Sequence, residues 1–174
     1  MVIMKLVFVT GLAGIDRRTI IDLALQRAAR KDKFKVIDLE VLNNVLDDVK
    51  GVKDLETARN ILSNFYGEVE RIMITGLKEQ KENIILNGSF TLDTAYGYVM
   101  SVPEDFFRSF KPDNIVILEK ETSEGDYKTD EHQRINRHYG TLYSSMCGSF
   151  LKIIKFREKR MMDAVNQLSE VIKH

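Results

Sequence analysis

Residues 6–19 read LVFVT-GLAGIDRRT, which is a β-branched and aromatic run, then a glycine-containing turn, then the start of an apolar helical pattern. A strand that leads through a glycine turn into a helix is the setting of the phosphate-binding loop G-x-x-x-x-G-K-[ST]. The first glycine of that motif is kept at Gly11. Asp16 stands at the second glycine, Arg17 at the lysine and Arg18 at the Ser/Thr. The sequence therefore predicts a nucleotide-binding loop with three substituted groups.

Short apolar runs alternate with helical patterns along the rest of the chain. Four further runs rich in Val, Ile, Leu or Phe predict strands at residues 34–37, 84–86, 115–118 and 151–156. Such runs, without polar alternation, are typical of strands buried on both faces of a parallel sheet. The pattern predicts an α/β three-layer sandwich, with a five-stranded parallel sheet and helices on both faces. Ligands of such sheets bind at the carboxyl ends of the strands, where the turn after Thr10 would lie.

Helical patterns fall between the expected strands. The first helix follows the glycine turn, a second covers residues 41–49, and residues 55–65 and 69–77 form one further helix or two. A short helix starts with Pro103 at its first position. An apolar stripe through Ile135, Leu142 and Met146 predicts a helix that ends at Gly148, and the last helix covers residues 161–172. Two polar segments are expected to be loops. One is residues 87–101, and the other is residues 119–133, an exposed loop that leads into a helix.

Composition narrows the class of protein. A length of 174 residues with 44% hydrophobic and 30% charged content fits one globular domain over residues 1–174. The formal net charge of zero argues against nucleic acid as a partner, because nucleic-acid-binding domains are usually basic. A single cysteine, Cys147, suits a cytoplasmic location. The N-terminal apolar run is too short to span a membrane, and the three histidines lack the spacing of metal ligands, so neither a membrane nor a metal site is expected.

Four segments together resemble the archaeal type of adenylate kinase. They are Lys5 to Thr10 with Gly11 and Gly14, then KPDNIV at 111–116, EHQRINR at 131–137, which is similar to the family's E-H-Q-x-x-N-R, and GSFLKII at 148–154, which is similar to its G-A-x-x-K-I-I. The resemblance covers essentially the whole chain. It implies a P-loop kinase-like core with a lid, reversible phosphoryl transfer from ATP to AMP with magnesium, and a homotrimer.

The resemblance also implies which residues would act. The expected nucleotide-binding residues are Gly11, Ala13, Gly14, Asp16, Arg17, Arg18 and Thr19 around the phosphates, with Arg59 near AMP, and the expected charge-stabilising catalytic residues are Arg17 and Arg137. Arg17 keeps the charge of the family's lysine, although its guanidinium is longer and planar. Asn87 ends a strand where the family tends to carry an aspartate near the metal, and an amide brings no charge to the cation.

Three departures from the family pattern weaken the expected chemistry. A carboxylate at Asp16, about 6 Å from one phosphate charge at an effective dielectric of about 20, costs on the order of 3 kcal/mol. Arg18 removes the hydroxyl that holds magnesium, and Thr19 is rotated by roughly 100° around the helix from that position. Residues 119–128 are shorter than the family's lid and hold four carboxylates and no arginine. Lid-type arginines contribute about 10³ to 10⁵ in rate.

Several interpretations stay open from the sequence alone. The glycine turn can simply join a strand to a helix, or Asp16 can form an internal ion pair with Arg17 or Arg18 in place of a bound phosphate. Three functions compete: a kinase-related protein with weak nucleotide binding and little turnover, an active nucleoside monophosphate kinase that uses Arg17, and a non-enzymatic interaction protein on a kinase fold.

Overall fold

All five strands expected from the sequence lie side by side and parallel in the computed structural model, which describes residues 5–39, 43–79 and 83–174. The strand order is β2-β3-β1-β6-β7. The strands of this sheet are β1 (Leu6–Thr10), β2 (Phe34–Asp38), β3 (Asn83–Asn87), β6 (Asn114–Lys120) and β7 (Phe150–Phe156). The central strand β1 is entirely buried, as expected for a strand covered on both faces.

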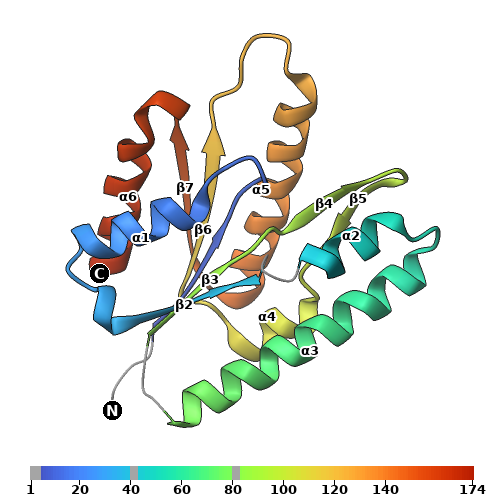
Figure 1. Cartoon of the computed structure of the whole chain (residues 1–174), viewed down its shortest axis with the longest axis horizontal. Coiled ribbons are helices and arrows are strands. Elements are labelled where there is room, and N and C mark those ends of the chain that lie inside the picture. The colour runs from blue at the N-terminus through green and yellow to red at the C-terminus, as the bar shows by residue number, and fades with distance from the viewer. Residues whose placement is uncertain (1–4, 40–42, 80–82) are drawn as a thin grey trace.

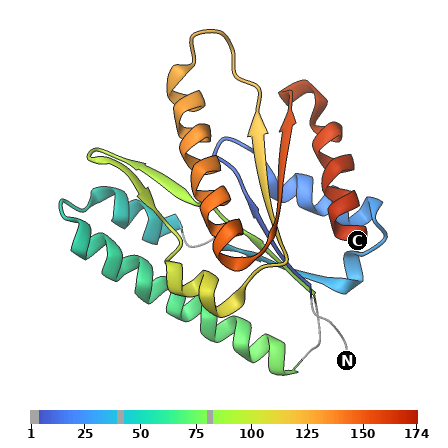
Figure 2. The same cartoon turned by 180° about the vertical axis from the view of Figure 1, so that it is seen from behind.

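Two helical layers cover the sheet, so the predicted three-layer α/β fold is confirmed. The helices are α1 (Arg17–Arg27), α2 (Asn43–Gly51), α3 (Leu55–Glu79), α4 (Glu104–Phe110), α5 (Tyr127–Cys147) and α6 (Met161–Lys173), with short 3₁₀ turns at Lys31–Lys33 and Glu158–Arg160. Helices α1 and α6 pack on one face around Val7 and Val9. Helices α3, α4 and α5 pack on the other face around Leu6 and Phe8 (Figures 1 and 2).

The structure answers one open question about the helices and corrects one boundary. Helix α3 is continuous, so the two patterns from residue 55 onward belong to one helix. Pro103 is the N-cap of α4 and not its first helical residue. Positions 41 and 42 of the second expected helix lie outside the described residues. In the described part of the chain, no helix is long and apolar enough to cross a membrane.

The expected loop over residues 87–101 is wrong in its central part. It contains a hairpin of β4 (Thr91–Thr94) and β5 (Gly97–Met100), which forms a separate two-stranded antiparallel sheet. The hairpin lies beside α5, where the Thr91 hydroxyl is 2.9 Å from His132 Nε2 and the Tyr98 hydroxyl donates to Glu131 over 3.1 Å. Burial lowers the pKa of His132. Thr91 and His132 therefore connect the small sheet to the main one through α5.

Candidate functional site

The glycine turn leaves the carboxyl end of β1, in the middle of the sheet (Figure 1). Two polar residues end the neighbouring strands at the same edge. Asn87 is paired in register with Val9 of β1, and Asp38 of β2 is paired with Asn87. The strand order switches beside β1, so this is the position at which ligands bind in open α/β sheets.

The Arg17 side chain is folded back into the turn and is almost completely buried, with 2% of the residue exposed. Its Nη1 donates to the backbone carbonyls of Gly11 and Leu12, the latter over 3.1 Å. Its Nε donates to Asn87 Oδ1 over 2.8 Å. The guanidinium therefore occupies the turn as an internal cation, held by carbonyl oxygens that point inward.

The backbone N–H groups of the turn also have internal acceptors. Ile15 N–H donates to the Leu12 carbonyl over 3.0 Å, and Arg17 N–H donates to the Ile15 carbonyl over 2.8 Å. Thr19 N–H donates to Asp16 Oδ1 over 3.1 Å, which makes Asp16 the N-cap of α1. A loop that cradles phosphate presents such N–H groups to the anion. Here three of them already donate within the protein.

One alternative left open by the sequence was an internal ion pair of Asp16 with Arg18, and Arg18 has other partners in the structure. Arg18 pairs with Asp22 over 2.9 Å and with Asp38 over 2.5 Å. Hydrogen bonding to Asp22 is the largest cause that raises the pKa of Arg18, and Asp38 adds to it. Asp38 also accepts from Asn87 Nδ2 over 2.8 Å. A continuous polar chain thus runs from the turn to α1 through Arg17, Asn87, Asp38 and Arg18.

The two glycines of the turn have different steric surroundings, which gives a matched pair of variants. A Cβ on Gly11 would lie 2.8 Å from the backbone oxygen of Leu118, whereas a Cβ on Gly14 would meet nothing within 4 Å. We expect Gly11→Ala to lower the free energy of unfolding by about 1–3 kcal/mol, because strand β6 must shift. Gly14→Ala should change it by about 0.5 kcal/mol or less. Urea denaturation measures both, and equal effects would contradict the close approach of β6.

The second expected catalytic residue, Arg137, lies on α5 and is paired with Glu119 at the end of β6. Its Nε and Nη2 contact the two carboxylate oxygens over 2.7 and 2.5 Å. The Glu119 side chain is 5% exposed and that of Arg137 is 36% exposed. This hydrogen bonding raises the pKa of Arg137. Both residues line a cavity of about 460 Å³ at the ends of β6 and β7, together with Arg134 and Lys155.

The expected exposed loop over residues 119–133 is shorter than the sequence suggested. Strand β6 continues to Lys120, and α5 begins at Tyr127. Gln133 is buried and pairs with the Lys120 backbone, accepting its N–H over 2.8 Å and donating to its carbonyl over 3.0 Å. The EHQ motif therefore contacts two parts of the fold. Glu131 and His132 bind the β4–β5 hairpin, and Gln133 binds strand β6 of the main sheet.

Arg59 does not join these groups. It is exposed on α3, and within residues 5–39, 43–79 and 83–174 its side chain makes no ion pair. The neighbouring Ala58 lines a separate cavity of about 380 Å³ between α3 and the β4–β5 hairpin, together with Leu55, Tyr96 and Tyr98. The expected residues thus separate into three places: the turn, the end of β6 and the exposed face of α3.

Sequence reasoning missed Asp38, Glu119 and Gln133 as members of the site. Asp38 and Glu119 directly follow the predicted strands 34–37 and 115–118. A polar residue at the carboxyl end of a buried parallel strand lies at the edge of the sheet where ligands bind. The positions of Asp38 and Glu119 directly after predicted strands could therefore have identified them as site residues. Gln133 had no indication in the spacing, because its partner is backbone.

The oxygen donors beside the turn do not fit a magnesium ion. Asn87 Oδ1 accepts from Arg17, and the two Asp38 oxygens accept from Asn87 and Arg18. Arg18 itself is a cation at the position of the metal-binding hydroxyl. In the described part of the chain, no three His, Cys, Asp or Glu residues form a cluster that could hold a metal.

Curated proteins are similar to this chain over most of its length, although no family model matches it. It is 29% identical to the adenylate kinase of Pyrococcus abyssi, over 95% of this chain and 94% of that protein. It is 28% identical to the adenylate kinase of Pyrococcus horikoshii, over the same shares. With the adenylate kinase of Methanopyrus kandleri it shares 28% identity over 61% of this chain and 66% of the relative. This similarity and the fold support a relation of the chain to the archaeal type of adenylate kinase.

Proposed function

We propose that the chain is an adenylate kinase-related P-loop protein in which nucleotide binding is weakened and phosphoryl transfer from ATP to AMP is poor or lost. The observation that supports this most is the position of Arg17. Its buried guanidinium donates to Gly11, Leu12 and Asn87, inside the turn that would hold the phosphates.

A triphosphate in this turn has to displace those contacts. Hydrogen bonds to charged groups contribute about 1.5–3 kcal/mol each, so releasing the guanidinium offsets much of what a phosphate would gain. Asp16 adds a carboxylate at the N-terminus of α1, where a phosphate would otherwise bind to free N–H groups. Both effects act on ATP binding, before any chemical step.

The lid side supports low turnover in the same way. The Arg137 guanidinium is already paired with Glu119 through one bidentate edge, its Nε and Nη2. An arginine that stabilises a transferring phosphoryl group must give its N–H groups to that phosphate. The Nε and Nη2 groups of Arg137 can do so only by leaving an almost buried carboxylate unpaired, which is costly.

A coupled assay of ADP formation from ATP and AMP with magnesium tests the proposal. We expect turnover at least about 10³-fold below that of the Pyrococcus abyssi adenylate kinase measured in parallel, the size of the loss for a missing arginine finger. Comparable turnover would overturn the proposal and favour an active kinase that uses Arg17. Calorimetric titration with ATP, ADP and AMP separates the remaining cases, because silence with all three favours a non-enzymatic interaction protein.

The proposal includes the remaining expectations from the family. Nucleotides are the proposed ligands, the location is cytoplasmic and the assembly is a homotrimer. Light scattering after size-exclusion chromatography measures the mass of the assembly directly, and a mass of one chain would remove the trimer from the proposal.

A further inference from the structure

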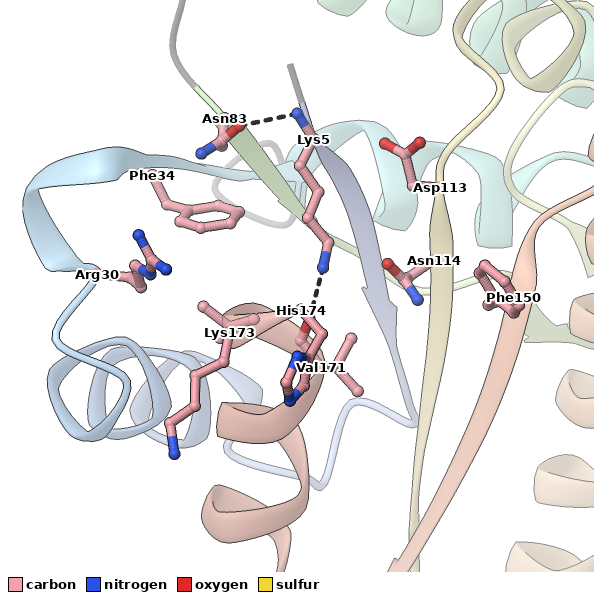
Figure 3. Close-up of a pocket in the computed structure, with 11 residues that line it drawn as sticks. Lys5, Arg30, Phe34, Asn83, Asp113, Asn114, Phe150, Val171, Lys173 and His174 are labelled. Atoms are coloured by element: carbon pink, nitrogen blue, oxygen red, sulfur yellow. Dashed lines mark hydrogen bonds between the residues drawn. The ribbon is translucent and has the colours of Figure 1, made fainter. Parts of the chain in front are cut away.

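A cavity of about 590 Å³ lies at the opposite edge of the sheet from the glycine turn. The amino ends of the strands form it, through Lys5, Phe34, Asn83, Asn114 and Phe150. The connection between α1 and the following 3₁₀ turn contributes Arg30, and the end of α6 closes one side (Figure 3). Its volume is in the range of cavities that bind small molecules.

Two cations that face this cavity are not neutralised by a carboxylate. Arg30 is half-buried, and its side chain makes no hydrogen bond or ion pair with any residue that the structure describes. Lys5 Nζ donates to a neutral acceptor, the Val171 carbonyl, over 2.6 Å. Burial lowers the pKa of Lys5, so its charged form gains from an anion nearby.

The carboxylate of Asp113, also in the wall, does not provide that partner. It accepts the N–H of Leu6 over 2.7 Å, and its effect on the pKa of Lys5 is smaller than that of burial. Lys173, near the rim, is paired with Glu170 over 2.7 Å. The positive charge that faces the cavity therefore comes from Lys5 and Arg30.

The cavity also has an apolar surface. Figure 3 draws the Phe34 ring between the side chains of Arg30 and Lys5. Phe150, on the far side, is 79% exposed, which is unusual for a phenylalanine. An aromatic ring beside a guanidinium favours a ligand that combines a flat apolar group with an acidic group.

We propose that this cavity binds a small organic anion, in which a phosphate or carboxylate group meets Arg30 and Lys5 and a flat apolar group packs against Phe34. Arg30 can hold either acidic group through two parallel N–H donors, and Lys5 adds a point charge. The site lies at the other edge of the sheet from the glycine turn and uses none of its residues. It is therefore independent of the proposed kinase-related function.

Titration of the full chain, followed by two-dimensional ¹H–¹⁵N NMR, tests the site. Phenyl phosphate and benzoate carry the two acidic groups on the same ring, and inorganic phosphate lacks the ring. We expect saturable shifts of the Lys5, Phe34 and Asn83 amides with at least one aromatic anion, and binding at least tenfold weaker with inorganic phosphate. The tighter aromatic anion identifies the acidic group that the site prefers.

Two arginines close in sequence, Arg30 in the cavity wall and Arg27 at the last position of α1, give a variant and its control. Arg30→Gln should weaken binding of the preferred anion at least tenfold, while Arg27→Gln, which changes an exposed arginine that does not line the cavity, should change it less than twofold. Lys5→Met gives a second loss if Arg30→Gln fails to fold. Shifts confined to residues 11–18, no saturable shift with either aromatic anion, or equal binding by the Arg30 and Arg27 variants would overturn the proposal.

Discussion

A triple variant, Asp16→Gly with Arg17→Lys and Arg18→Thr, is expected to bind ATP at least about a hundredfold more tightly than the natural chain. Removing a carboxylate about 6 Å from a phosphate charge contributes on the order of 3 kcal/mol at an effective dielectric of about 20, and 1.4 kcal/mol is a factor of ten. Lysine in place of Arg17 also frees the Gly11 and Leu12 carbonyls from the guanidinium. Threonine restores the hydroxyl that a magnesium ion needs at that position.

Isothermal titration with magnesium and ATP measures the gain. Arg18→Thr alone is the control, because it breaks the Asp38 ion pair and leaves Arg17 in the turn. That single variant should gain less than about tenfold, since an exposed ion pair contributes about 0–1 kcal/mol. No gain in the triple variant would mean that the cradle has closed for reasons other than these three side chains.

An Arg137→Met variant is expected to lower the free energy of unfolding by about 2–4 kcal/mol. Glu119 is almost buried, so its carboxylate would be left without its partner, and breaking a buried ion pair costs about 3–5 kcal/mol. The lower figure applies because Arg137 is 36% exposed and water can reach the vacated space. Chemical denaturation with urea provides the measurement.

Two further variants decide whether the loss comes from the buried charge. Glu119→Leu combined with Arg137→Met removes both charges and should recover most of the stability. Arg108→Met breaks an exposed ion pair with Glu104, on a surface where the two side chains are 67% and 51% exposed, and should cost about 0–1 kcal/mol. Equal losses for the Arg137 and Arg108 variants would contradict the buried-charge explanation.

The central sheet was predictable because a buried parallel strand appears in the sequence as a short, continuous apolar run. Runs such as residues 115–118 are apolar without alternation, and no other element of this length requires that. The sequence pattern of the β4–β5 hairpin is weaker. Its strands have four residues each, and the connecting Ala95-Tyr96 is not one of the two-residue turns that predict hairpins.

Helix α5 shows where the rule of apolar residues inside fails. The expected apolar stripe is wrong, because Leu142 is 50% exposed and Met146 is 39% exposed. The buried face carries the polar residues Gln133, Asn136 and Ser144 together with Gly140 and the ring of Tyr143. A Cβ on Gly140 would lie 2.4 Å from Ile117 Cδ1, so a larger side chain at this position would require the Ile117 side chain of β6 to shift. Hydrogen bonds to the strand and the hairpin add to the apolar packing of Tyr143, and periodicity does not reveal them.

For the candidate site, the sequence predicted the substituted residues but not where their side chains go. That Arg17 would fold into the turn depends on Asn87, a residue 70 positions away that the sheet brings beside it. Likewise, the partner of Arg137 is Glu119, and their contact depends on how α5 lies along β6. Long-range polar pairs of this kind follow from the fold and have no local pattern.

The short connection between β6 and α5 is anchored on both sides of its bend. Gln133 holds the Lys120 backbone, and Glu121 pairs with Arg157 of the segment after β7 over 2.7 Å. Residues 122–126 therefore span two fixed supports. The fold should accept a much longer insertion at this bend without disturbing the sheet, because each doubling of loop length adds only about 0.6 kcal/mol of closure entropy. Lid segments of related kinases could therefore be inserted at residues 122–126 of this protein. The increase in turnover with each added segment would measure the contribution of a lid to catalysis.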